Sequence, residues 1–243
     1  MKNKDLQKEI SQRVEFIRSI VAKSGAKGIV FGNSGGKDSA LVGILCKMAC
    51  ENTLAVILPC ESKRNFEQDK HDGEALSAQF GIETRVIDIT ATKKALVEAL
   101  GGEISHTASV NIAPRLRMTT LYAIAAHENR LVAGTGNACE AYMGYFTKWG
   151  DGAYDFNPIA DLSVSEIYEL LKFLNAPQSI IEKAPSAGLF DGQSDESEMG
   201  VTYKSIEKYL CGEEVQQHER EIIERYHNRS KHKREKACLF NVQ

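Results

Sequence analysis

The 243-residue sequence predicts an α/β protein with a doubly wound parallel sheet, flanking helices and a helical C-terminal part. Two observations carry this prediction. Short apolar runs alternate with helical patterns as far as residue 133, an order typical of parallel strands joined by helical crossovers. A Gly-rich segment follows the first apolar run, and sheets of this class bind ligands at the carboxyl ends of strands. We expect a single domain spanning residues 1–243.

The elements of the sheet follow in order along the chain. Apolar residues at helical spacing predict a first amphipathic helix over residues 5–23. We then expect strands at residues 28–31, 53–59, 83–89 and 130–133, and helices after residue 39 and at residues 66–80, 91–100 and 111–129. Pro114 suits the first turn of the last of these helices, where no N–H is needed. Arg115 would then lie near a helix start, where a cation is unfavourable without an anionic partner.

The second half of the chain is expected to be mainly helical. Residues 144–158 are aromatic, Gly-rich and acidic, and they predict a packed surface loop. Helices are expected at residues 164–174, 178–183, 203–210 and 213–231. The polar, Gly-rich residues 185–199 are interpreted as a loop that could act as a mobile lid.

The segment Ser34–Ser39 between the first strand and its helix has the chemistry of a phosphate-binding loop. Gly35 and Gly36 allow backbone conformations in which successive N–H groups converge on an anion. The following helix adds its N-terminal N–H groups and the positive end of its dipole. Lys37 adds a cation, and Asp38 is best explained as a ligand for Mg²⁺. An ordinary Gly-rich turn is the alternative.

The spacing of this loop differs from two common nucleotide motifs. A GxxxxGK[ST] loop would need Ser or Thr after Lys37, where this chain has Asp38, and GxGxxG is absent. A second candidate loop, residues 134–140, follows the strand at residues 130–133. In this topology the two loops share one edge of the sheet, so that Thr135 can meet the nucleotide and Glu140 the metal.

Composition excludes several other functions. Net charge is −3, which gives no general attraction to nucleic acid, and the basic run at residues 225–236 is interpreted as a solvated helical face. The six cysteines lack zinc-site spacing and are interpreted as reduced thiols. No apolar run approaches a membrane span, and the N-terminus lacks the apolar stretch of a signal peptide. A cytoplasmic protein without membrane or nucleic-acid partners is expected.

The loop resembles the SGGxDS loop of the ATP pyrophosphatases, which cleave ATP between its α and β phosphates. Later motifs resemble one family of them, the ammonia-dependent NAD synthetases. They are Asn-x-x-x-Arg-x-Arg from residue 111, Gly-Thr-Gly-Asn-x-x-Glu from 134, Gly-Tyr-Phe-Thr-Lys-Trp-Gly-Asp-Gly from 144, Ala-Pro-Ser-Ala from 184, Ser-Asp-Glu-x-x-x-Gly-Val-x-Tyr from 194 and His-Lys-Arg from 232. The resemblance covers residues 28 to about 234 and implies an adenine nucleotide alpha-hydrolase-like fold.

The resemblance implies an ATP- and Mg²⁺-dependent amidation of deamido-NAD with ammonia. NAD would form through an NAD-adenylate with release of AMP and pyrophosphate, the last step of NAD biosynthesis, in a homodimer. Carried over by position, the ATP ligands would be Gly32, Asn33, Ser34, Gly35, Gly36, Lys37, Asp38, Ser39, Thr135 and Ser186. Deamido-NAD would contact Arg115, Lys148, Asp155, His232 and Lys233, and the metal would be held by Asp38 and Glu140.

Two residues of the segment at 144–158 are candidates for catalysis. Lys148 lies in the Phe-Thr-Lys-x-Gly-Asp-Gly element together with Asp151, for which we hypothesise a role in binding and deprotonating ammonium. The alternative is a solvated loop pair. This chain departs from the family pattern at three positions related to ATP contact. It has Lys37 in place of Gln, Val164 in place of Lys, and Gly188 in place of Asp.

Three alternatives are weighed beside this interpretation. A glutaminase domain of the nitrilase type is not expected, because only about 27 residues precede the ATP loop. The protein would then use free ammonia or ammonia supplied by a separate protein. Another adenylating ligase, acting on tRNA or a different carboxylate, is the nearest rival enzyme. A nucleotide-binding sensor without catalysis would bind ATP and release no pyrophosphate.

Overall fold

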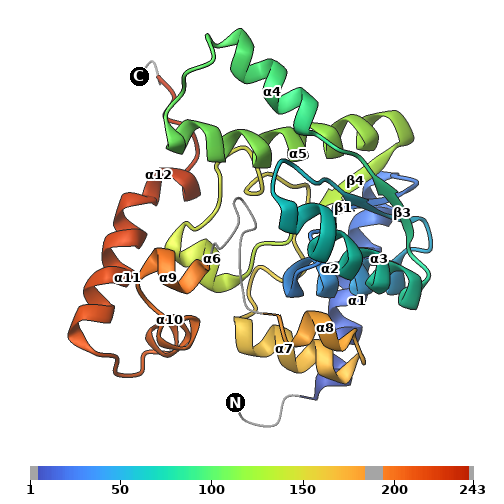
Figure 1. Ribbon diagram of the computed structural model, residues 1–243. Coiled ribbons are helices and arrows are strands. Elements are labelled where there is room, and N and C mark those ends of the chain that lie inside the picture. Colours follow the sequence, from blue (N-terminus) through green and yellow to red (C-terminus); the bar gives the residue numbers. More distant parts are fainter. Residues whose placement is uncertain (1–4, 184–193, 241–243) are drawn as a thin grey trace.

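The fold is a parallel sheet covered by helices on both faces (Figure 1). The computed structural model describes residues 5–183 and 194–240. Within them the sheet has four strands in the order β3-β2-β1-β4. The strands are β1 (Gly28–Gly32), β2 (Thr53–Ile57), β3 (Glu83–Val86) and β4 (Arg130–Ala133). The predicted doubly wound α/β class is confirmed.

The central strand β1 explains why both faces of the sheet are buried. It pairs in parallel with β2 on one side and β4 on the other, with Val30 opposite Leu54 and Val132. Successive side chains point to opposite faces. Ile29 and Phe31 therefore enter one hydrophobic cluster, and Val30 enters the other. The continuous apolar run of this strand reflects burial on both sides.

Two groups of helices cover these faces (Figure 1). The cluster around Phe31 includes side chains from α1, α2, α3, α7 and α8, and the cluster around Val30 includes side chains from α5. The first group is α1 (Leu6–Ser24), α2 (Lys37–Ala49), α3 (Lys70–Phe80), α7 (Val164–Phe173) and α8 (Gln178–Ile181). The second face carries α5 (His106–Glu128), against which α4 (Thr90–Ala99) packs. A π-helical turn, η1 (Asn65–Asp69), leads directly into α3.

The C-terminal helices form a third cluster beside the sheet, seen in orange and red in Figure 1. Its buried side chains include Met143, Met199, Tyr203, Ile206 and Ile223. The elements are α6 (Ala138–Met143), α9 (Asp195–Met199), α10 (Tyr203–Leu210), α11 (Gln217–Arg229) and α12 (Lys231–Arg234). The predicted helical C-terminal part is confirmed. Of these helices, α10 and α11 pack against α6, which follows β4.

The expected start of the long helix at residue 111 is wrong. The helix α5 begins at His106, and the hydroxyl of Ser105 caps it by accepting a bond of 3.2 Å from the N–H of Ala108. Pro114 therefore lies inside the helix, where it removes one backbone hydrogen bond. Its side chain is buried, as are those of Ile112 and Ala113 beside it. Arg115 consequently lies in the middle of a helix and not at its positive end.

The expected polar loop at residues 185–199 is partly wrong. Residues 184–193 lie outside the described part of the chain, and Asp195–Met199 is the helix α9. Met199 packs into the C-terminal cluster, and Asp195 accepts a bond of 3.0 Å from the hydroxyl of Tyr203. The run of acidic residues concealed this short helix because few apolar positions mark it. The helix expected at 213–231 begins later, at Gln217, and ends at Arg229.

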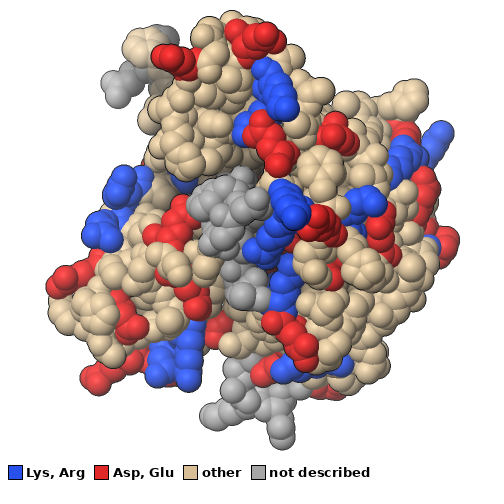
Figure 2. All heavy atoms as spheres, viewed as in Figure 1, with Lys and Arg blue, Asp and Glu red and all other residues tan. Residues whose placement is uncertain are grey.

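Charges of both signs are interspersed over the face of the molecule shown in Figure 2. This mixture agrees with the net charge of −3. Among the helices of residues 5–183 and 194–240, none has the length and apolar character needed to cross a bilayer.

One ionic contact ties the two edge strands of the sheet together. Glu128, at the end of α5, is bound by Arg85 of β3 and accepts a bond of 2.8 Å from Nε of Arg130 of β4. These two guanidinium groups lower the pKa of Glu128 to about 2. Because the folded-state pKa lies below that of an unfolded glutamate, the contact stabilises the fold above about pH 4.5 and is lost as pH falls toward 2.

We predict that Glu128→Gln lowers the free energy of unfolding by about 1 kcal/mol at pH 7, a value discounted for solvent screening. The difference from the unchanged protein should shrink at pH 3. Urea denaturation at the two pH values measures it. Glu83→Gln is the matched control, since Glu83 contacts Arg85 from an exposed position and should cost less than about 0.5 kcal/mol. An equal loss from Glu128→Gln at both pH values would contradict the account.

Candidate active site

A cleft of about 1400 Å³ opens at the carboxyl edge of the sheet. Its walls come from the segments that follow β1, β2 and β4, from α5, from residues 143–152 and from α12. The described candidate residues that line it are Gly32, Asn33, Ser34, Gly36, Lys37, Asp38, Ser39, Arg115, Thr135, Glu140, Lys148, Asp151, His232 and Lys233. Elements distant in sequence therefore bring the predicted nucleotide and substrate residues into one space.

The phosphate loop takes its shape from one glycine. Gly35 has a φ of 66°, and a Cβ there would lie 2.2 Å from the carbonyl oxygen of Asp69. Both the left-handed backbone and the close approach require glycine. Gly36 is extended, with a φ of −99°, and it is the N-cap of α2. The expectation of a backbone conformation that favours glycine is thus confirmed for Gly35 and wrong for Gly36.

Hydroxyl groups brace the loop from within. The Oγ atoms of Ser34 and Ser39 lie 3.1 Å apart, and the Ser39 hydroxyl donates a bond of 3.0 Å to the carbonyl of Gly36. Asn33 is buried, and its side-chain amide donates a bond of 2.9 Å to the carbonyl of Gly73 in α3. Since no described side chain caps α2, its first N–H groups are available to an anion in the cleft.

Lys37 turns its ammonium inward. Its side chain is 6% exposed, and Nζ lies 2.7 Å from Oδ2 of Asp38 and 5.4 Å from the centre of the Tyr203 ring. Although burial opposes the charged form, the carboxylates of Asp38 and Glu140 raise the pKa of Lys37 above its usual value. This single ammonium therefore offsets part of the negative charge of the two carboxylates.

Asn137 joins the two carboxylates that the sequence motifs assign to a metal. It is fully buried, and its Nδ2 donates a bond of 3.2 Å to Oδ1 of Asp38. It also forms a capping box with Glu140: the Asn137 N–H donates to Oε2 of Glu140 at 2.9 Å, and the Glu140 N–H returns a bond of 3.0 Å. Asn137 was missed from the sequence, although the spacing Asn-x-x-Glu marks such a helix start.

The pair formed by Asp38 and Glu140 suits a divalent cation held jointly with phosphate. Burial, followed by the nearby charge of Asp38, raises the pKa of Glu140 well above its usual value, which a cation between the two groups would reverse. Within residues 5–183 and 194–240 no group of three metal-ligating side chains occurs. Mg²⁺ commonly uses one or two carboxylates together with substrate phosphates and water. The residues present fit that ion.

A set of basic residues faces the phosphate loop across the cleft. Nζ of Lys148 donates a bond of 2.5 Å to the carbonyl of His232, and Nε of Arg115 donates one of 3.3 Å to the carbonyl of Lys148. Nζ of Lys233 donates to the carbonyl of Phe146 at 2.6 Å. Burial, together with repulsion from Arg115, lowers the pKa of Lys233. Arg229, His232, Lys233 and Arg234 line the cleft, so the interpretation of residues 225–236 as a solvated face is wrong for these four. Arg225, Lys231 and Lys236 are exposed and lie outside the lining.

Asp151 is the acidic residue among these cations. It is exposed to the cleft, and its Oδ1 accepts a bond of 2.9 Å from the N–H of Thr147. Desolvation by the surrounding protein raises the pKa of Asp151, although this hydrogen bond and the charges of Lys233 and Arg117 act in the opposite direction. A carboxylate with a raised pKa in a cleft is suited to proton transfer near neutral pH.

Four of the expected positions lie outside the cleft lining or outside the described residues. Asp155 lies outside the cleft lining, where Oδ2 accepts a bond of 2.7 Å from the N–H of Val132 and Oδ1 accepts one from the Tyr122 hydroxyl. Val164 is buried at the start of α7 within the C-terminal hydrophobic cluster, so it contributes no charge to the cleft. Ser186 and Gly188 lie outside the described residues.

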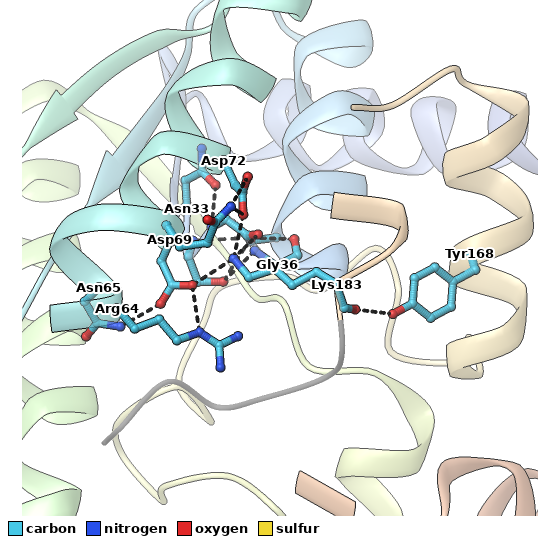
Figure 3. Close-up of polar contacts among 12 residues, drawn as sticks. Asn33, Gly36, Arg64, Asn65, Asp69, Asp72, Tyr168 and Lys183 are labelled. Carbon is cyan, nitrogen blue, oxygen red and sulfur yellow. Dashed lines mark hydrogen bonds and ion pairs between the residues drawn. The ribbon is translucent and has the colours of Figure 1, made fainter. Parts of the chain in front are cut away.

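A group of charged residues beneath the phosphate loop, drawn in Figure 3, was also missed from the sequence. Asp69 of η1 and Asp72 of α3 both contact Lys183, which follows α8. Nearby, Arg117 donates a bond of 3.1 Å to Oδ1 of Asn65, and burial lowers its pKa. The sequence offered little signal for this group, because it assembles from η1, α3, α5 and the end of α8.

These features define a nucleotide-binding α/β protein, and comparisons give its family. The profile of the NAD synthase family matches residues 9–237. The NH(3)-dependent NAD(+) synthetase of Alkaliphilus oremlandii is 44% identical over 241 residues, covering 95% of each chain. The structure of NMN synthetase from Francisella tularensis has a TM-score of 0.94 and 40% identity, covering 99% of this chain and 100% of that one.

A further structure agrees with this assignment. The NH3-dependent NAD synthetase from Campylobacter jejuni, solved in complex with the nitrate ion, has a TM-score of 0.80 and 31% identity, covering 98% of this chain and 100% of that one. The chain therefore belongs to the NAD synthetase family of ligases. The family expected from the ordered motifs is confirmed.

We predict that Gly35→Ala weakens binding of an ATP analogue at least tenfold, because the added Cβ would meet the Asp69 carbonyl. Calorimetric titration with Mg²⁺ present measures this. Gly25→Ala is the matched control: Gly25 ends α1 with a φ of 70°, and nothing lies within 4 Å of the position that an added methyl group would take. It should cost about 1 kcal/mol of stability and leave the affinity unchanged. Equal affinity in both variants would contradict the assigned role of Gly35.

Proposed function

We propose that the protein amidates the nicotinate carboxylate of deamido-NAD with ammonia, using ATP and Mg²⁺ and releasing AMP and pyrophosphate. One observation supports this most directly. A phosphate loop with two carboxylates, Asp38 and Glu140, shares one cleft with a basic wall that includes Arg115, Lys148 and Lys233. The volume of about 1400 Å³ suits two nucleotide-sized ligands.

The first step joins two anions, so the site must offset their charge. The nicotinate carboxylate attacks the α-phosphorus of ATP, and pyrophosphate leaves. N–H groups of the loop and of the α2 N-terminus stabilise the negative charge that develops on the phosphates. Mg²⁺, held by Asp38 and Glu140, would supply further charge stabilisation there. Lys37 would then be released from its pairing with these carboxylates to meet phosphate.

The second step needs neutral ammonia as the nucleophile. Ammonia attacks the carbonyl carbon of the adenylate, the amide forms, and AMP leaves. We assign to Asp151 the binding of ammonium and the acceptance of its proton, because this carboxylate faces the cleft with a raised pKa. Lys148 and Lys233 lie at the same wall, where they would bind the anionic substrate and keep it beside Asp151.

A second candidate substrate is nicotinate mononucleotide, which lacks the adenylyl half of deamido-NAD. The likeness to the Francisella tularensis NMN synthetase, with its TM-score of 0.94, favours it. Both substrates carry the same nicotinate carboxylate, so the chemistry at Asp38, Glu140 and Asp151 is the same for either. The difference lies in how much of the cleft is filled.

We further propose a homodimer, as the resemblance of the motifs implies, and the direct use of ammonia. The Alkaliphilus oremlandii relative, named an NH(3)-dependent synthetase and matched over 95% of each chain, supports the use of ammonia. With ATP and Mg²⁺ present, the purified protein should form NAD from deamido-NAD with ammonium and show no turnover with glutamine. Product formation and pyrophosphate release are followed together.

Other outcomes of this assay would assign a different function. A higher kcat/KM for nicotinate mononucleotide than for deamido-NAD would indicate NMN synthesis instead. ATP binding without pyrophosphate release from either substrate would favour a sensor.

We predict that Asp151→Asn slows amide formation about a hundredfold while leaving adenylate formation within a few-fold. Adenylate formation is measured by the exchange of labelled pyrophosphate into ATP without ammonium. In the unchanged protein the amidation rate, at a fixed concentration of ammonium ion, should rise as pH passes upward through the raised pKa of Asp151 and then level off. The variant lacks the carboxylate that binds ammonium, so its residual rate should follow free NH₃ and show no levelling at that pH. Equal loss of both steps would contradict the role of Asp151 as a base.

A further inference from the structure

Lys183 makes an unusual set of contacts beneath the phosphate loop (Figure 3). Its Nζ lies 2.8 Å from Oδ1 of Asp69 and 2.8 Å from Oδ2 of Asp72. The same ammonium donates a bond of 3.1 Å to the carbonyl oxygen of Gly35. One largely buried cation therefore connects the loop after β1 with η1 and α3.

The carboxylates around this ammonium are firmly held. Asp72 is fully buried, and the side-chain amide of Gln68 donates to both of its oxygens at 3.1 Å. Asp69 accepts a bond of 2.7 Å from the amide of Asn65 and lies 3.3 Å from Nε of Arg64. The backbone carbonyl of Lys183 in turn accepts a bond from the Tyr168 hydroxyl of α7. The position of the ammonium is thus fixed from several sides.

The contact with Gly35 controls the direction of a loop N–H group. In a planar trans peptide the C=O of one residue and the N–H of the next point in opposite directions. Since the Gly35 carbonyl is directed at Lys183, the N–H of Gly36 must point the other way, and it does so toward Oγ of Ser34 at 3.3 Å. Gly36 and Ser34 line the cleft.

Steric contact and hydrogen bonding act on this peptide together. The backbone of Gly35 rests against the carbonyl of Asp69, which blocks movement toward η1. That contact alone would still allow the peptide between Gly35 and Gly36 to rotate. The bond from Lys183 to the Gly35 carbonyl opposes that rotation, because a flipped carbonyl would leave the ammonium without its third acceptor.

We propose that Lys183 is a positioning residue for ATP: through the Gly35 carbonyl it orients the peptide between Gly35 and Gly36 so that its N–H faces the phosphates. This inference rests on the proposed use of the loop to bind ATP. A purely structural role, the neutralisation of Asp69 and Asp72, makes a different prediction. In that case any substitution that keeps the charges balanced should leave ATP affinity unchanged.

The test removes the ammonium and balances the charge at once. Lys183→Met combined with Asp72→Asn leaves no unpaired buried carboxylate, because Asp69 keeps its contacts with Arg64 and Asn65. Asp72→Asn alone retains the Lys183 contact with the loop. Affinity for α,β-methylene-ATP with Mg²⁺ is measured by calorimetry for both. We expect about a tenfold loss in the double variant relative to Asp72→Asn.

A matched control addresses the loss of a buried lysine in general. Lys93 has a 10% exposed side chain, against 13% for Lys183, and pairs with Glu61 at 2.7 Å outside the cleft. Lys93→Met should bind the analogue within twofold of the unchanged protein. In steady-state assays the double variant at Lys183 should raise KM for ATP and leave KM for the nicotinate substrate unchanged.

Affinity of the double variant within twofold of Asp72→Asn would overturn the inference. Thermal unfolding is recorded for each variant. If the methionine variant does not fold, Lys183→Leu with Asp72→Asn, which also removes the donor to the Gly35 carbonyl, is judged by the same criterion. Binding of the analogue needs no amidation, so an unchanged protein that binds it but forms neither NAD nor NMN contradicts the proposed function and leaves the Lys183 comparison valid.

Discussion

Buried charge at the carboxyl edge of the sheet is the constraint on which the site depends. Lys37 is enclosed between Asp38 and Glu140, and Asn137 bonds to both carboxylates. An unpaired charge in this place would cost several kcal/mol, so each group requires the others. Because Asp38 follows β1 and Glu140 follows β4, the arrangement fixes the two adjacent loops relative to each other. Tyr203 extends it into the C-terminal helices, with its ring 5.4 Å from the Lys37 ammonium.

Bonds from side chains to backbone carbonyl groups organise the opposite wall of the cleft. The carbonyl groups at the end of α6 and in the following turn accept bonds from the basic residues of α12, among them a bond of 2.8 Å from Lys233 to Gly144. The Ser230 hydroxyl likewise donates to the Met143 carbonyl at 3.1 Å. Cations at a helix C-terminus are favourable. These contacts hold residues 144–152 against the C-terminal helices, and they place Lys148 and Asp151 facing the phosphate loop.

Periodicity predicted the sheet well, because parallel strands buried on both faces leave continuous apolar runs such as Ile29–Phe31. It failed where a local signal conflicts with the observed helix: Pro114 suggested a helix start, whereas it lies buried inside α5. The short helices α6 and α9 were missed because five or six residues give too few turns for a pattern to appear.

The site was predictable where one continuous motif contains the residues that form it, as in the loop containing Gly35 and Asp38. It was less predictable where distant segments supply single residues. Lys183 reaches the loop from the end of α8, and no spacing in the sequence relates it to Gly35. Asp155 matches a family position, yet its carboxylate is engaged by the Val132 N–H and lies outside the cleft lining of this chain.

The most direct test of the account follows an oxygen atom. If the nicotinate carboxylate attacks the α-phosphorus of ATP in the cleft between the loop and Asp151, one carboxylate oxygen must leave in AMP when ammonia displaces it. Deamido-NAD labelled with ¹⁸O in the carboxylate, incubated with ATP, Mg²⁺ and ammonium, should give AMP carrying one ¹⁸O and unlabelled pyrophosphate. Label in the pyrophosphate or its hydrolysis product, or unlabelled AMP formed alongside amide, would contradict the account.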